Sequence, residues 1–218
     1  MTSLSGHSGG TTSTITNIVR RKSNPRQPRT TKQAGVRSLL TALSTGWGGL
    51  TSAQQDAWIA AAPNYLVTKN GVSTPLKGNT AYIRANVNLS KAAQTLITVP
   101  VAPVAFPNIK IASAAAAAGT PALSLTVTGA TTVPSGFTMM FVATPCFSPG
   151  KRSVANKLRL LGSHTLTSSV ADLLSIWEAY PGFGVPVAGM RIEVGFYLVS
   201  NTTGQETTPQ TIQIVVAA

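Results

Sequence analysis

Acidic residues are scarce in this sequence, and charged residues of both signs are few. Only 10% of the 218 residues are charged, well below the roughly 25% of an ordinary soluble domain. Seventeen Lys and Arg face five Asp and Glu, which gives a formal net charge of +12. A free monomer with so few surface charges would be poorly solvated, whereas a subunit covered by its neighbours would not be. The low charge therefore weakly favours a protein that works inside an assembly.

Cysteine and long apolar runs are also nearly absent. Cys146 is the only cysteine, so a disulfide within the chain and a cysteine-based zinc site are excluded. No run reaches the roughly 18 uninterrupted apolar residues of a membrane span. The polar, Gly/Ser/Thr-rich first residues do not resemble a signal peptide. We therefore expect no membrane contact and a protein that stays in the cytoplasm until it assembles.

Groups that carry enzyme chemistry are equally scarce. Each of the five acids suits a structural position, in a helix start, on a helix or strand surface, or in a turn; they are Asp56, Asp172, Glu178, Glu193 and Glu206. His7 and His164 have no acid or cysteine close in sequence, so neither predicts a metal site or a catalytic triad. No phosphate-loop or dinucleotide-binding motif is present. We therefore predict a non-enzyme with no catalytic, metal-binding or cofactor-binding residues and no small-molecule substrate.

Positive charge is concentrated before the first acid in the chain. The basic residues of this stretch are Arg20, Arg21, Lys22, Arg26, Arg29, Lys32 and Arg37. Residues 1–30 show no hydrophobic periodicity and contain two prolines that favour extended backbone, so we predict an extended basic arm. An unopposed basic run favours an anionic partner over a solubilising tail. That partner is a protein subunit or nucleic acid; because residues 18–37 contain no aromatic, nucleic acid would be contacted through its phosphates.

Residues 31–96 are predicted to form a small unit of three helices. Four apolar residues of the first helix recur at i, i+3, i+4 and i+7 and so share one face; they are Val36, Leu39, Leu40 and Leu43. The glycine-rich stretch 44–50 is expected to break this helix. After a loop over residues 64–79, a third helix is predicted over 80–96, capped by Asn79 or Thr80.

The second helix is predicted from a local start signal. Thr51 and Gln54 have the spacing of a capping box, and Pro63 ends the helix. With the first helix it would form a hairpin around the glycines. We expect Trp47 to pack against Trp58, because each offers a large apolar area, and together with Leu50 to anchor the hairpin.

The remaining residues predict an extended linker followed by a β-domain. Residues 97–108 contain three prolines in a short apolar stretch and are predicted to be extended. Within 109–218, apolar and polar residues alternate over 123–128 and 192–198, and 137–143 reads as a strand buried on both faces. Short strands separated by Gly and Pro favour an antiparallel, Ig/FN3-like β-sandwich. The predicted fold class is α+β.

Two segments of the β-domain are exceptions to the strand pattern. Residues 170–177 predict one inserted helix, because Val170, Leu173, Leu174 and Trp177 have helical spacing. We expect Ser169 to cap it. The alanines at 114–118 are compatible with a helix or with a strand of small residues.

Residues between Asn24 and Asn86 form a recognisable pattern. It consists of Asn24, Pro25, Arg26, Thr31, Gln33, Arg37, Trp47, Leu50, Thr51, Gln54, Trp58, Gly78, Tyr82 and Asn86. The pattern resembles a group of poorly characterised phage virion structural proteins, which have an N-P-x-T arm, a two-tryptophan hairpin containing W-x-x-L-T-x-x-Q, and a C-terminal β-sandwich. Segments 143–150 and 187–194 are similar to pieces of that sandwich. The resemblance implies a virion structural role and no catalytic residues.

Three functions follow as expectations. The first is a virion protein of the capsid, neck or tail, made in the host cytoplasm, that contacts other virion proteins and copies of itself through the basic arm and the hairpin. The second is a sequence-nonspecific nucleic-acid-binding packaging protein. The third is a receptor- or carbohydrate-binding sandwich, for which the loop 181–186 offers only Phe183 as an aromatic.

Overall fold

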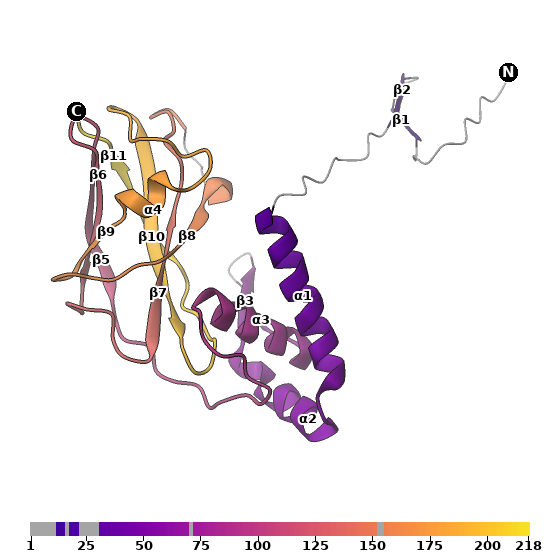
Figure 1. Ribbon diagram of the computed structural model, residues 1–218. Coiled ribbons are helices and arrows are strands. Elements are labelled where there is room, and N and C mark those ends of the chain that lie inside the picture. Colours follow the sequence, from indigo (N-terminus) through magenta and orange to yellow (C-terminus); the bar gives the residue numbers. More distant parts are fainter. Residues whose placement is uncertain (1–11, 16–17, 22–30, 70–71, 152–154) are drawn as a thin grey trace, which may run out of the picture. The chain divides into compact units, whose positions relative to one another are not determined.

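The computed structural model describes residues 12–15, 18–21, 31–69, 72–151 and 155–218 (Figure 1). The chain divides into two compact units, Met1–Leu39 and Leu40–Ala218. In the first, β1 (Thr12–Ile15) pairs antiparallel with β2 (Ile18–Arg21). The sequence predicted only an extended arm here; both segments contain residues that favour strands, Thr and Ile in β1 and Ile and Val in β2. The rest of the predicted arm lies outside the described residues.

The first two helices follow one another with almost no gap. Helix α1 (Thr31–Gly49) continues past Gly46 and Gly48 and ends at Gly49, so the expected break falls at the end of the glycine-rich stretch 44–50. Gly46 has a packing role there, because a Cβ at this position would lie 3.0 Å from the hydroxyl of Tyr82. Helix α2 (Ser52–Ala61) begins with the predicted capping box, in which the Thr51 and Gln54 side chains each accept the other's backbone N–H. A 3-10 turn, η1 (Ala62–Asn64), follows α2.

The predicted loop 64–79 contains secondary structure. Strands β3 (Leu66–Lys69) and β4 (Val72–Pro75) form an antiparallel hairpin before α3 (Gly78–Lys91). No side chain caps α3, contrary to expectation, and Gly78 lets its first turn approach α2 closely: a Cβ there would lie 2.7 Å from Cγ1 of Ile59.

Helix α3 ends five residues before the predicted boundary. Ala93 adopts a left-handed φ of 54°, and the N–H of Gln94 donates to the Leu89 carbonyl. This pair of features is the Schellman arrangement that terminates helices. The following segment 97–108 contains neither helix nor strand.

Seven strands form two antiparallel sheets (Figure 1). The order β5-β6-β9 makes one sheet, and β11-β10-β7-β8 makes the other. The strand bounds are β5 Lys110–Ala117, β6 Ala122–Thr128, β7 Phe137–Ala143, β8 Arg159–Ser163, β9 Val170–Asp172, β10 Arg191–Ser200 and β11 Gln210–Val215. The alanine run whose structure was left open belongs to a strand, since residues 114–117 pair with β6.

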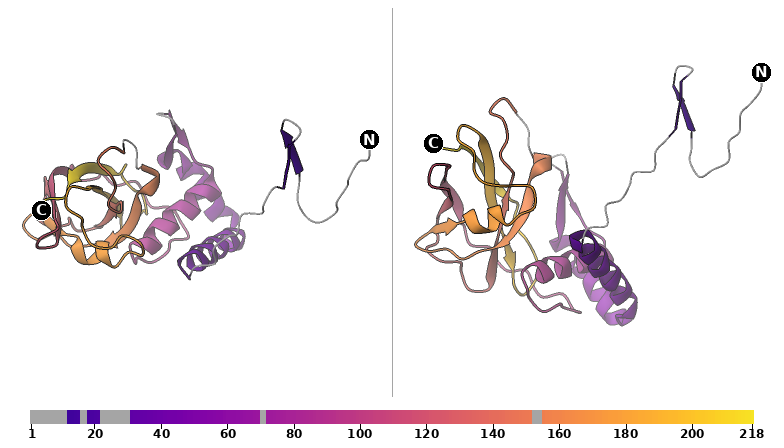
Figure 2. Two further views of the ribbon diagram at one scale, coloured as in Figure 1. Left: turned by 90° about the horizontal axis from the view of Figure 1, so that it is seen from above. Right: turned by 45° about the horizontal axis from the view of Figure 1, so that its top comes forward.

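The main core lies between the two sheets, which Figure 2 shows from two further directions. Leu123, Leu125 and Val127 of β6 pack there with alternate residues of β7 and β10. The opposite face of β7 is buried too, because Met140 and Val142 join a second cluster with Ala92, which follows α3. The prediction that 137–143 is buried on both faces is therefore confirmed. The structure is a mixed α and β fold with two antiparallel sheets, as predicted at that level.

The predicted helix over 170–177 is mostly wrong. Residues Val170–Asp172 form strand β9, which pairs with β6, and only α4 (Leu174–Glu178) is helical. Ser169 does not cap it; its hydroxyl donates to the Ala130 carbonyl. The helical spacing arose because Leu173 and Trp177 are both fully buried in the core. Leu173 immediately precedes α4, and Trp177 lies within it. A further 3-10 turn, η2 (Ala155–Lys157), precedes β8.

Candidate functional site

The basic residues predicted to contact a charged partner fall in different parts of the chain. Arg20 and Arg21 end strand β2, and Lys32 and Arg37 lie in α1, where Arg37 is exposed. Lys22, Arg26 and Arg29 lie outside the described residues. Their role as contacts therefore remains a prediction.

The predicted hairpin anchor is part of a larger aromatic cluster. The ring of Tyr82 in α3 lies 5.8 Å from that of Trp47 and 5.5 Å from that of Trp58. Trp58 also contacts Tyr65, at 5.8 Å between centroids. Tyr82 therefore links the two tryptophans. The sequence predicted that they would pack directly against each other. Leu50 is half-buried, and its N–H donates to the Trp47 carbonyl.

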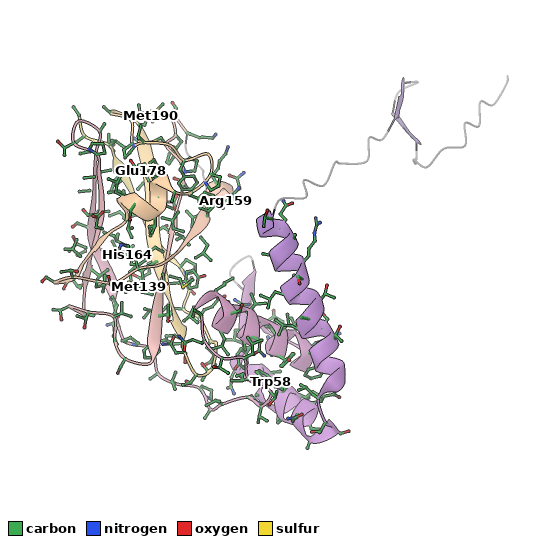
Figure 3. The ribbon with its side chains drawn as sticks, in the orientation of Figure 1. Trp58, Met139, Arg159, His164, Glu178 and Met190 are labelled. Atoms are coloured by element: carbon green, nitrogen blue, oxygen red, sulfur yellow. The ribbon has the colours of Figure 1, made fainter. Side chains whose placement is uncertain are left out.

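The aromatic cluster holds the beginning of the segment 97–108. The indole N–H of Trp58, which Figure 3 labels in the helical part, donates to the Thr98 carbonyl at 2.9 Å. The side chain of buried Asn86 binds both the N–H and the C=O of Ile97, at 2.7 and 3.0 Å. Because these buried polar groups satisfy one another, the chain leaves the helical part in a defined direction.

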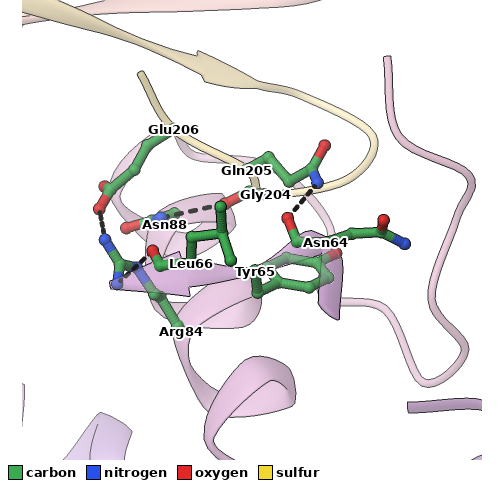
Figure 4. A pocket seen from close by; sticks show the side chains of 8 residues that line it. All are labelled: Asn64, Tyr65, Leu66, Arg84, Asn88, Gly204, Gln205 and Glu206. Atoms are coloured by element: carbon green, nitrogen blue, oxygen red, sulfur yellow. Dashed lines mark hydrogen bonds and ion pairs between the residues drawn. The ribbon is translucent and has the colours of Figure 1, made fainter. Parts of the chain in front are cut away.

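A polar junction joins the helical part, residues 40–96, to the turn that connects β10 to β11 (Figure 4). The Asn88 amide donates to the Gly204 carbonyl and the Gln205 amide to the Asn64 carbonyl, each at 3.0 Å. The hydroxyl of Tyr65 donates to the Thr203 carbonyl, also at 3.0 Å. Backbone carbonyls on a turn thus receive side-chain donors from α3 and from the start of the β3–β4 hairpin.

An ion pair lies at the edge of this junction. The guanidinium of Arg84 contacts the Glu206 carboxylate at 2.6 Å and also donates to the Leu66 carbonyl (Figure 4). Both side chains are partly exposed, at 33% and 23%. The adjoining cavity has a volume of about 40 Å³, room for water but not for an organic substrate. The junction therefore has the properties of a structural contact.

Burial changes the acidity of three tyrosines. It raises the pKa of Tyr65 to about 12, because the phenolate would be desolvated. The pKa of Tyr82 is raised for the same reason. Burial and then the negative charge of Glu206 raise the pKa of Tyr197 to about 12. Ionisation of these tyrosines therefore costs folding free energy.

Stability is expected to fall at high pH through these tyrosines. The pKa of Tyr65 is about 12 in the folded chain against the ordinary 10.0, so the folded state binds the proton more tightly. Its stabilising contribution is complete below pH 10 and is lost as the pH rises through about 12. Replacing Tyr65 by Phe should therefore reduce the loss of unfolding free energy between about pH 9 and about pH 12 by on the order of 1–2 kcal/mol.

Urea unfolding followed by tryptophan fluorescence measures this difference. Tyr180→Phe, which removes a phenol from the segment that follows α4, serves as the matched control. Equal pH dependence of Tyr65→Phe and the wild-type chain would contradict the assignment. At neutral pH the same variant should lose about 1 kcal/mol, because the bond to the Thr203 carbonyl is gone.

Sequence reasoning missed most of the junction. Glu206 was predicted to have only a structural position, and nothing in the sequence indicated that it meets Arg84 across 122 residues. Gly204 carried no signal either. The one available hint was the position of Asn86 and Asn88 among the apolar residues of the predicted third helix, because amides that become buried there require partners.

The described residues contain neither a candidate metal site nor a candidate membrane-spanning helix. Among the described residues, no group of three His, Cys, Asp or Glu side chains is placed to hold a metal ion. The described helices include none with the length and apolar character needed to cross a membrane. No protein-family model, curated protein or solved structure matches the chain.

Proposed function

We propose that this chain is a non-enzymatic structural protein of a phage virion, in the capsid, neck or tail, that contacts copies of itself and other virion proteins. The basic arm and the helical hairpin would make these contacts, and an Ig/FN3-like β-sandwich would be the body. The three-plus-four arrangement of antiparallel strands around one core supports the sandwich assignment. The resemblance of residues 24–86 to virion proteins supports the location.

The observation that carries the proposal is the apolar face of α1. Leu43 is buried, but Val36 and Leu40, which share its face two turns and one turn earlier, are 58% and 41% exposed. Ile59 on α2 is 58% exposed as well. Helix faces of this kind are normally covered, and exposed apolar groups on a low-charge protein favour contact with another subunit. The hairpin therefore has an apolar surface available for assembly.

The test is the presence of the chain in virus particles. Particles would be purified through a density gradient from lysates of the organism that encodes the chain, and quantified by mass spectrometry. We expect several copies per particle, at a fixed ratio to the major shell protein. Particles that lack the chain would overturn the proposal.

Variants of α1 test the contact surface within the same experiment. Val36→Gln/Leu40→Gln should lower incorporation about tenfold, the effect of losing roughly 1.4 kcal/mol of contact. Ala34→Gln/Ser38→Gln changes two exposed residues on a different face of the same helix and should leave incorporation unchanged. Equal incorporation of the two variants would exclude the apolar face as the contact.

A second candidate is a packaging protein that binds nucleic acid without sequence preference. The observation in its favour is the run of seven basic residues before Asp56. It predicts binding to any duplex that weakens steeply with salt and that is lost when residues 1–37 are deleted.

A further inference from the structure

The segment that connects the helical part to β5 is apolar and exposed over most of its length (Figure 1). Residues 99–105, named here the proline segment, read VPVAPVA and contain no polar or charged side chain. Val99, Val101 and Val104 are 47%, 45% and 38% exposed. Loops are normally rich in Gly, Ser, Asn and Asp, so a mere spacer does not need three exposed valines. Contiguous exposed apolar residues instead mark contact sites.

Both ends of the proline segment are fixed to the rest of the chain. Just before it, the Thr98 carbonyl accepts the indole N–H of Trp58. Just after it, the ring of Phe106 lies 5.4 Å from that of Phe137 and packs against the core between the sheets. Between these two points, no hydrogen bond of the described residues involves the backbone of residues 99–105. The segment is therefore an exposed peptide that is tethered at both ends.

The sequence restricts the backbone of this peptide. Residues 100–105 are two copies of the tripeptide Pro-Val-Ala. Proline fixes its own φ at about −65° and keeps the residue before it in extended backbone, which restricts residues 99, 100, 102 and 103. A polyproline II helix has about three residues per turn, so the two prolines of the repeat share one edge and its two valines share another. Because proline has no N–H to donate, the repeat fits polyproline II recognition better than pairing with the edge of a sheet.

The partner that fits such a segment is a groove lined by aromatic side chains. A second copy of this chain does not offer one. Its three Trp, four Tyr and six Phe all belong to the described residues, and each of them is buried or half-buried. The sequence also has no charged residue from 92 to 109, so ion pairs with the partner are not expected. These properties favour a different protein with an uncharged, aromatic-lined groove.

We propose that the proline segment binds in an uncharged, aromatic-lined groove of a different protein. Val101 and Val104 fill apolar pockets of this groove, and Pro100 and Pro103 lie against its rings. Because both ends of the segment are already fixed, it loses little conformational entropy on binding. This contact is separate from the basic arm and the hairpin, and it does not require that the chain belongs to a virion.

Photocrosslinking in the organism that encodes the chain identifies what covers the segment. Benzoylphenylalanine would replace Ala102, an exposed residue on the edge of the repeat that carries neither proline nor valine. In the control chain it would replace Ala188, which is exposed in the loop before β10. We expect position 102, and not position 188, to form an adduct with another protein. Alanine substitution of the aromatic residues around the attachment point in that protein should abolish its binding to the full chain.

Three crosslinking results would overturn the proposal. The first is the absence of any adduct from position 102. The second is an adduct that joins two copies of this chain. The third is attachment to a protein whose binding to the full chain survives removal of the aromatic residues at the attachment point.

Variants of the full chain test which side chains make the contact, with calorimetric titration of the purified crosslinked protein as the measurement. Val101→Gln/Val104→Gln should lower the affinity at least about tenfold, because two valines are no longer buried in the groove. Val187→Gln/Val215→Gln changes two other exposed valines and should leave the affinity unchanged. Equal losses in the two variants would exclude the valines of the repeat as the contact and overturn the proposal.

The prolines have a matched pair of variants as well. Pro100→Ala/Pro103→Ala retains both valines and frees the backbone, so an affinity loss of about threefold to tenfold is expected. Pro181→Ala/Pro209→Ala replaces two exposed prolines elsewhere and should have no effect. An unchanged affinity after loss of Pro100 and Pro103 would contradict recognition in the polyproline II conformation.

A synthetic peptide of residues 97–108 provides a readout on the wild-type chain, which does not depend on how the variants fold. The peptide should compete with the chain for the crosslinked protein. A peptide of the same composition in which no two prolines are three residues apart should not compete. If neither peptide competed, or if both competed equally, the proline segment would not be the recognised element and the proposal would fail.

Discussion

Trp58→Ala is expected to destabilise the chain by about 3–5 kcal/mol, the usual cost of removing a fully buried tryptophan. Trp58 has no exposed surface, and its ring fills the space between Tyr65 and Tyr82. Its indole N–H also supplies the bond to the Thr98 carbonyl, which would be left without a partner. Urea unfolding at neutral pH, with circular dichroism as the signal, measures the change.

Two further variants separate the contributions of Trp58. Trp58→Phe retains most of the ring volume and loses the bond to Thr98, so a smaller cost of about 1–2 kcal/mol is expected. Trp47→Ala removes a tryptophan that is only partly buried, and it should cost clearly less than Trp58→Ala. If Trp47→Ala were the more damaging change, the centre of the aromatic cluster would lie at α1 and not at α2.

Gly204→Ala is expected to separate the helical part from the turn between β10 and β11. Gly204 has a φ of +66°, where an L side chain is strained by about 1–2 kcal/mol. A Cβ at this position would also collide with the backbone of Ala85 in α3. A flexible side chain could move out of the way of this Cβ, but the backbone of a helix cannot. Displacement of the turn would break the bond that Asn88 makes to the Gly204 carbonyl. We expect a total cost of about 3–4 kcal/mol by the same urea measurement.

Gly189→Ala is the matched control for this change. Its φ of +75° is similar, but no described atom lies within 4 Å of the added Cβ. This control should show only the backbone strain of about 1–2 kcal/mol. Limited proteolysis adds a local readout, because Gly204→Ala should expose the segment 97–108 to cleavage and the control should not. Equal effects of the two alanines on both measurements would mean that contact with α3 contributes nothing at this position.

Local signals in the sequence determined several elements correctly. The capping box at Thr51 and Gln54 predicts the start of α2, because the two residues satisfy each other's backbone donors without any distant partner. The mostly apolar stretch 137–143 predicts a strand covered on both faces, and β10 beside it is buried almost throughout. The two-sheet fold could be predicted because alternation and turn residues depend on neighbours along the chain.

Contacts between distant segments decided the rest. Helix α1 continues past Gly46, where the absence of a side chain makes room for Tyr82, a residue 36 positions further along. Residues 170–172 form a strand, in spite of their helical spacing, because β6 offers backbone partners there. The junction in which Arg84 meets Glu206 and Asn88 meets Gly204 had no pattern in the sequence. Periodicity reports which side of an element is buried, but only the tertiary structure determines which residues come to cover it.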